Sequence, residues 1–147
     1  MTQEMATKTY EKVPANYTLC LKGDCPKAAT CLRHVAVAMM PAEVKTWSIV
    51  SPTHLAQMEG ECSHYRSAEK VMYARGFVRM MSTMTVQQAH AVKDSIVATF
   101  GMNMYYRMRR GERLITPTEQ EEIYQLLEKK GINTRPEFDA YEEGYLW

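Results

Sequence analysis

The chain has 147 residues, of which 46% are hydrophobic and 24% are charged, and its formal net charge is +1. This composition is typical of a soluble single domain. The sequence contains no run of about eighteen apolar residues and no apolar signal-peptide core, so we expect neither a membrane span nor a secretory leader. We therefore predict a cytoplasmic protein with no membrane partner.

The small net charge conceals an uneven distribution. Residues 66–113 carry nine basic and three acidic side chains, a net charge of +6, whereas residues 114–147 carry three basic and eight acidic ones, a net charge of −5. A basic middle segment beside an acidic tail is typical of a nucleic-acid surface with an internal competitor. Two solvated faces that attract each other explain the pattern equally well, and we favour this second interpretation slightly.

The four cysteines follow the spacing C-x4-C-x5-C-x30-C. In a cytosolic protein such a cluster favours metal binding over free thiols or a redox-active disulfide. We predict one metal centre, with zinc slightly favoured over an iron–sulfur cluster, because a plant-type [2Fe–2S] loop shares the first spacing but not the second. His54 and His64 are spare candidate ligands. The predicted ligands are Cys20, Cys25, Cys31 and Cys62.

The first half of the chain shows helical periodicity in short pieces. Apolar spacing predicts a helix over Lys27–Met40 that Pro41 ends, followed by a short helix over Pro41–Trp47. We expect an extended piece over Ser48–Pro52 and a helical turn over Thr53–Met58. Steps of three and four then predict a helix over Ser67–Met81.

Two capping boxes are the clearest start signals in the second half. Thr85 and Gln88 predict the beginning of a helix over Val86–Phe100. Thr116, with proline and glutamate after it, predicts a helix over Pro117–Lys130. The acidic and aromatic tail is expected to pack back on the body.

A short arginine-rich helix, Met104–Arg110, lies between these two helices. Residues 86–131 therefore resemble the helix-turn-helix of phage-repressor-like proteins, in which a short helix reads DNA. The alternative is a helical bundle whose arginines are solvated, and we favour it slightly. The residues predicted to contact DNA or RNA are Tyr105, Tyr106, Arg107, Arg109, Arg110 and Arg113.

The chain also resembles a bacterial family of small four-cysteine proteins that is classed as a domain of unknown function. The resemblance spans nearly the whole chain and implies that the chain is complete, but it implies no activity, substrate or catalytic residue. The stretches that carry it are Cys25–Arg33, Tyr105–Gly111, Pro117–Gln120, Phe138–Glu143 and Tyr145–Trp147.

Together these patterns predict a mostly α, single small helical domain over residues 1–147. Its parts are a cysteine metal knuckle at 14–65, a helical bundle at 66–131 that is helix-turn-helix-like, and an acidic aromatic tail at 132–147. We expect a metal-stabilised, regulatory binding protein that contacts nucleic acid. The alternatives are an iron–sulfur or thiol redox protein and a protein-interaction module that uses the tail. Phosphate-binding glycine loops and hydrolase motifs are absent from the sequence, so we do not expect an enzyme.

Overall fold

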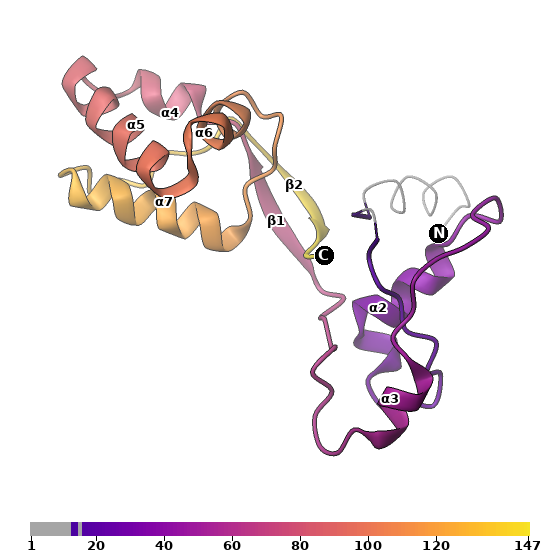
Figure 1. Cartoon of the computed structure of the whole chain (residues 1–147). Helices are drawn as coiled ribbons and strands as arrows, with labels where there is room; N and C mark the ends of the chain where they lie inside the picture. Colours follow the sequence, from indigo (N-terminus) through magenta and orange to yellow (C-terminus); the bar gives the residue numbers. More distant parts are fainter. Residues whose placement is uncertain (1–12, 15) are drawn as a thin grey trace. The chain divides into compact units, whose positions relative to one another are not determined.

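The chain forms two compact units in the computed structural model, which describes residues 13–14 and 16–147 (Figure 1). The first unit contains residues up to 69 together with 145–147, and the second contains residues 70–144. Helix is the dominant secondary structure, as predicted. Among the described residues, no helix is long and apolar enough to span a membrane.

The predicted helix over Lys27–Met40 is wrong as a continuous element. The segment contains the 3-10 helix η1 (Ala28–Thr30), the α-helix α2 (Leu32–Val35) and the 3-10 helix η2 (Ala36–Met39). Cys31 separates η1 from α2 because its backbone is extended and forms an antiparallel bridge with Ser67. A long-range backbone contact has therefore replaced a turn of helix.

The rest of the first unit has little regular structure. The predicted helix over Pro41–Trp47 is wrong, since no helix forms there. The extended piece is confirmed, because Ile49 forms a parallel bridge with Leu19. The predicted helical turn is also confirmed as α3 (Pro52–Gln57), which Ser51 caps by accepting a hydrogen bond from His54 N.

The predicted helix over Ser67–Met81 is wrong for a different reason. The structure has the strand β1 (Lys70–Arg75) and then the short helix α4 (Val78–Ser82). β1 pairs with β2 (Ala140–Tyr145) in a two-stranded sheet. The partner strand lies about seventy residues away, so local periodicity cannot reveal the pairing.

Both capping boxes are confirmed. α5 (Val86–Phe100) begins at Thr85, and α7 (Pro117–Lys129) begins at Thr116, with both reciprocal hydrogen bonds present in each box. Between them lies α6 (Met102–Arg109), which begins directly after Gly101, two residues earlier than predicted. A positive φ of 90° at Gly101 lets the chain turn from α5 into α6 without a side-chain clash.

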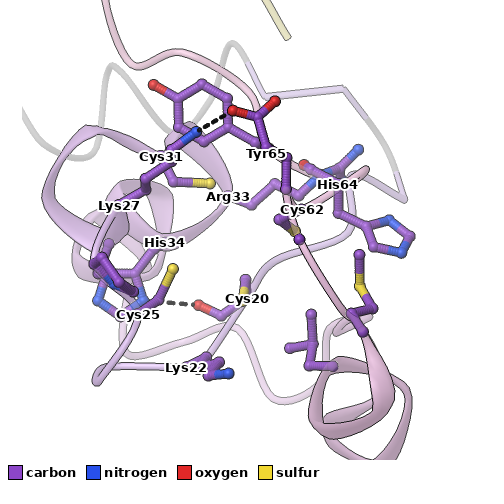
Figure 2. Close-up of a pocket in the computed structure, with 16 residues that line it drawn as sticks. Cys20, Lys22, Cys25, Lys27, Cys31, Arg33, His34, Cys62, His64 and Tyr65 are labelled. Carbon is purple, nitrogen blue, oxygen red and sulfur yellow. Dashed lines mark hydrogen bonds and ion pairs between the residues drawn. The ribbon is translucent and has the colours of Figure 1, made fainter.

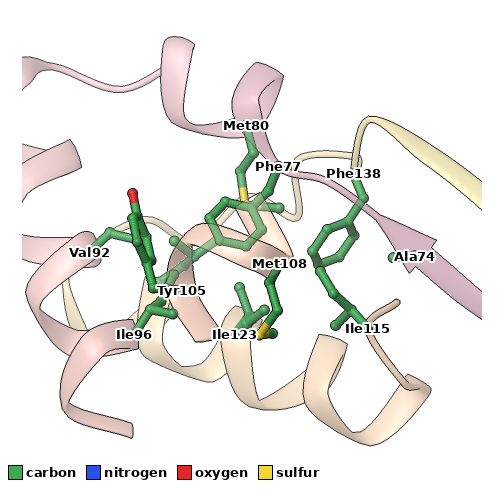
Figure 3. Close-up of a cluster of buried hydrophobic side chains, with 11 residues drawn as sticks. Ala74, Phe77, Met80, Val92, Ile96, Tyr105, Met108, Ile115, Ile123 and Phe138 are labelled. Atoms are coloured by element: carbon green, nitrogen blue, oxygen red, sulfur yellow. The ribbon is translucent and has the colours of Figure 1, made fainter. Parts of the chain in front are cut away.

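The second unit has a continuous apolar core, to which its helices, β1 and the tail all contribute (Figure 3). Phe77 and Phe138 are its largest fully buried side chains, with exposed fractions of 0% and 1%. Phe138 packs edge-on against Tyr124, with ring centroids 5.6 Å apart. The prediction that the aromatic tail packs on the body is therefore confirmed for Phe138.

Candidate functional site

All four cysteines line one pocket of the first unit, which we call the four-cysteine pocket (Figure 2). Its volume is about 270 Å³. Three of the cysteines come from the loop before α2 and from the start of that helix, and Cys62 comes from the loop after α3. The chain therefore brings together four thiols that the sequence spreads over residues 20–62.

All four thiols are free rather than joined in disulfides. Cys31 is buried, and the other three are partly exposed. Within residues 13–14 and 16–147, no group of three or more Cys, His, Asp or Glu side chains is already arranged around one point to hold a single ion. A shared ion would therefore require side-chain rotations that bring the sulfur atoms closer together.

The two cysteine-bearing segments are joined by backbone hydrogen bonds. Leu32 N donates to Arg66 O at 2.6 Å, and Ala68 N donates to Thr30 O at 2.9 Å. Arg33 adds a side-chain link, because its Nε donates to the His64 carbonyl oxygen at 2.8 Å. These contacts fix the positions of the two loops relative to each other.

Basic side chains surround the thiols. Lys22, Lys27 and Arg33 line the same pocket, while Glu61 is the acidic residue that lines it with them. Lys27 Nζ lies 3.7 Å from a Glu61 carboxylate oxygen, but this pair is largely exposed and screened by water. The lining therefore places three cationic side chains in the same pocket as the four thiols.

His34 is a pocket residue that the sequence analysis missed. Its Nδ1 lies 3.0 Å from the Cys20 carbonyl oxygen. A carbonyl oxygen only accepts hydrogen bonds, so Nδ1 carries the proton and Nε2 keeps its lone pair when the ring is neutral. No spacing in the sequence signals His34, because its partner is the backbone carbonyl oxygen of Cys20.

The two histidines that the sequence did single out lie in different environments. His64 lines the pocket, whereas His54 does not. Their rings pack edge to face with centroids 5.4 Å apart. His64 Nε2 is buried and has no hydrogen-bond partner among the described residues.

The six predicted nucleic-acid residues do not all lie on one surface. Tyr105 is 3% exposed, and its ring belongs to the core of the second unit (Figure 3). Arg110 pairs with Glu112 at 2.7 Å, and Arg113 forms a two-bond pair with Glu119. Glu112 and Glu119 therefore already neutralise two of the arginines that were predicted to contact DNA or RNA.

The other predicted contacts remain on the outside of α6. Arg107 is exposed, and Arg109 and Tyr106 are partly exposed. Neither Arg107 nor Arg109 forms an ion pair within 4 Å in the part of the chain that the structure describes. The nucleic-acid interface and the helix-turn-helix stay predictions, and the interface would depend mainly on these residues.

Comparison with known sequences supports the resemblance noted from the motifs. A family model described as a family of unknown function, DUF6078, matches residues 1–147. The chain belongs to the DUF6078 family. No curated protein and no solved structure matches it significantly. Membership of DUF6078 assigns no activity, so a functional proposal for this member must be based on its own residues.

Proposed function

We propose that this protein is a metal-stabilised binding protein whose four-cysteine pocket holds one metal centre. The observation that carries the proposal is that Cys20, Cys25, Cys31 and Cys62 all line one pocket of about 270 Å³. Four randomly placed cysteines in a chain of this length would not be expected to meet at one pocket. Cytosolic proteins use such clusters of thiols mainly for metal binding.

Zinc is our first candidate, with the four thiolates as its ligands. Zinc–sulfur bonds are about 2.3 Å long, and structural zinc sites have four ligands in a tetrahedral arrangement. Bound zinc would cross-link the loop that carries Cys20 and Cys25 to the loop that carries Cys62. Because ligand deprotonation and folding are coupled to binding, the metal would stabilise the first unit.

An iron–sulfur cluster is the alternative, and the size of the pocket favours it. A cluster spreads its cysteine ligands over several iron atoms, so it needs more room than one zinc ion. Lys22, Lys27 and Arg33 around the pocket would offset the negative charge of a thiolate-ligated cluster. The remaining alternative is a set of free thiols without metal. It predicts a pocket that binds neither zinc nor an iron–sulfur cluster.

Metal content separates these candidates. The full chain should be purified without oxygen and without a metal-affinity tag, and zinc, iron and acid-labile sulfide should be measured per chain. A colourless protein with zinc favours the structural site, and a brown protein with iron and sulfide favours the cluster. A protein that takes up neither metal on reconstitution contradicts the proposal.

Ligand variants test the same pocket residue by residue. Cys62→Ser should lower the metal content and expose the first unit to proteolysis, because it removes the one ligand that comes from the second loop. Met58→Leu is the matched control, since Met58 lines the pocket without offering a thiolate. Full metal occupancy in Cys62→Ser would contradict the four-ligand site.

A further inference from the structure

A second hollow lies within the second unit, where α4, α5 and α6 meet; we call it the α4–α6 hollow. Its volume is about 390 Å³, within the range of about 300–1,000 Å³ that is typical of small-molecule sites. His90 and Lys93 of α5 line it, together with Tyr105, Tyr106 and Arg109 of α6. On each helix these residues are one, three or four positions apart, so they occupy one side of it.

Lys93 lies beside both tyrosines of the hollow. Lys93 Nζ donates a hydrogen bond to the Tyr106 hydroxyl at 3.2 Å. The same Nζ lies 5.8 Å from the centroid of the Tyr105 ring. The ring of Tyr105 packs in the core, and its hydroxyl points away from the cluster (Figure 3). Tyr105 therefore offers a hydrogen-bond donor from a rigid support.

Arg109 lines the same hollow from α6, four positions after Tyr105. Burial raises the pKa of Tyr105, and the positive charges of Arg109 and Lys93 act in the opposite direction. Both cations line the hollow together with Tyr105. The backbone of Arg109 is also held in place, because its carbonyl oxygen accepts a hydrogen bond from Phe77 N at 3.3 Å.

Acidic groups near the hollow do not cancel this charge. The rest of the lining consists of Val78, Met81 and Ser82 of α4 and Ala89 of α5, so the lining contains no carboxylate. Asp94, the neighbour of Lys93, is exposed and lies outside the lining. Glu112 is engaged by Arg110 and is likewise outside it. The hollow therefore keeps two full positive charges and several neutral donors.

We propose that the α4–α6 hollow binds a phosphate group, through Lys93, Arg109 and the two tyrosine hydroxyls. Phosphate has several acceptor oxygens and up to two negative charges, which matches two cations with hydroxyl donors between them. The guanidinium of Arg109 can donate two parallel hydrogen bonds to such a group, and Lys93 acts as a point charge. The phosphate belongs either to a small phosphorylated ligand or to a nucleic-acid backbone. This proposal is independent of the metal centre, which lies in the other unit.

Calorimetric titration of the full-length protein with inorganic phosphate at low salt tests the proposal. We expect saturable binding that Arg109→Gln and Lys93→Gln each weaken by about tenfold or more, the loss expected for a hydrogen bond to a charged group. Tyr105→Phe keeps the core ring and should weaken binding less. Arg107→Gln is the matched control, because Arg107 is an exposed arginine of the same helix that does not line the hollow.

Two further titrations identify the source of the phosphate. A mononucleotide that binds at least as well as inorganic phosphate, together with loss of binding after dephosphorylation, indicates a small ligand. A single-stranded oligonucleotide that binds more tightly, and is weakened by the same variants, indicates a nucleic-acid backbone. The proposal is overturned if phosphate does not bind up to about 10 mM, well above the range of a specific site. It is also overturned if Arg107→Gln weakens binding as much as Arg109→Gln does.

Discussion

Arg33 Nε donates a hydrogen bond of 2.8 Å to the His64 carbonyl oxygen, and this contact joins segments that are 31 residues apart. The same guanidinium donates from Nη1 to the Thr18 carbonyl oxygen at 2.7 Å. Its carbon Cζ also lies 4.9 Å from the centroid of the Tyr17 ring. One side chain therefore holds together the two segments that bear the cysteines.

The first prediction concerns this link. Arg33→Lys keeps the charge but loses the planar fork that reaches two carbonyl oxygens, so it should destabilise the first unit by about 1.5–3 kcal/mol. Amide hydrogen exchange at Leu32, whose N–H bonds to Arg66 O, should speed up accordingly. Arg66→Lys is the control, because among the described residues that guanidinium bonds only to the adjacent Tyr65 carbonyl oxygen, at the surface. Equal exchange rates in both variants would contradict this role of Arg33.

Structural elements could be predicted where their sequence signals lie within a few residues of one another. The helices α5 and α7 were predicted to within a residue at their starts, because a capping box is complete within four residues. The spacing of Val71, Ala74, Val78 and Met81 imitates a helix, yet the segment forms β1 and α4. Gly76, with a φ of 74°, interrupts it, and β2 stabilises β1 from far along the chain.

The candidate site, too, was predictable from the sequence only where its signals were local. The sequence identified the four cysteines, and the structure brings all of them to one pocket. Arg33 and His34 could not be assigned, because their partners are backbone carbonyls set by the fold rather than by spacing. The surface charges of Arg110 and Arg113 were also uncertain from sequence, since Glu112 and Glu119 engage them only in the folded chain.

The second prediction concerns the start of α7. Thr116 Oγ1 accepts a hydrogen bond from Glu119 N at 3.2 Å, and the Glu119 carboxylate accepts one from Thr116 N at 2.9 Å. Thr116→Ala should lower the free energy of unfolding of the second unit by about 0.5–2 kcal/mol. Thr118→Ala, at the exposed second position of the same helix, is the control. Urea unfolding curves that coincide for both variants would show that the cap does not stabilise the helix.

The third prediction concerns the pH dependence of the same cap. Burial raises the pKa of Glu119, but hydrogen bonds from Arg113 and Thr116 outweigh it and hold the pKa below its usual value. The unfolded chain therefore takes up the proton first as the pH falls. The contribution of Glu119 is fully present above its unfolded pKa of about 4.3 and is lost as the pH falls through the lower folded value.

Glu119→Gln measures this contribution. It should destabilise the protein at pH 7 and should flatten the fall in stability below about pH 4.3. Glu122 is an exposed residue of the same helix, so Glu122→Gln should leave the stability at pH 7 and its fall at low pH nearly unchanged. A Glu119→Gln variant whose acid unfolding profile matches that of the unchanged protein would show that this carboxylate makes no contribution to the pH dependence.

The fourth prediction compares two glycines with left-handed backbones. A Cβ at Gly76 would lie 2.6 Å from Asp139 Oδ2, and that carboxylate accepts hydrogen bonds from Val78 N and Arg79 N at the start of α4. A Cβ at Gly131, whose φ is 81°, would meet nothing within 4 Å. Both alanine variants incur the cost of a left-handed backbone, about 1–2 kcal/mol. Only Gly76→Ala also disrupts the hydrogen bonds of Asp139 at the start of α4.

The measured free energy of unfolding should therefore fall further for Gly76→Ala than for Gly131→Ala, by about 0.5–2 kcal/mol. Amide exchange at Val78 and Arg79 should speed up in the first variant alone. Equal losses of stability would mean that Asp139 adapts to the added methyl group without loss of its two hydrogen bonds.

X-ray absorption spectroscopy of the metal in the purified full-length protein tests the central claim most directly, because it reports the ligand atoms themselves. We predict a shell of sulfur atoms at about 2.3 Å around zinc, or sulfur together with a nearby iron shell for a cluster. The number of sulfur atoms in this shell should fall in Cys62→Ser and stay unchanged in Met58→Leu. A metal surrounded only by nitrogen and oxygen, or a chain that binds no metal, would contradict the claim that the four cysteines form a metal centre.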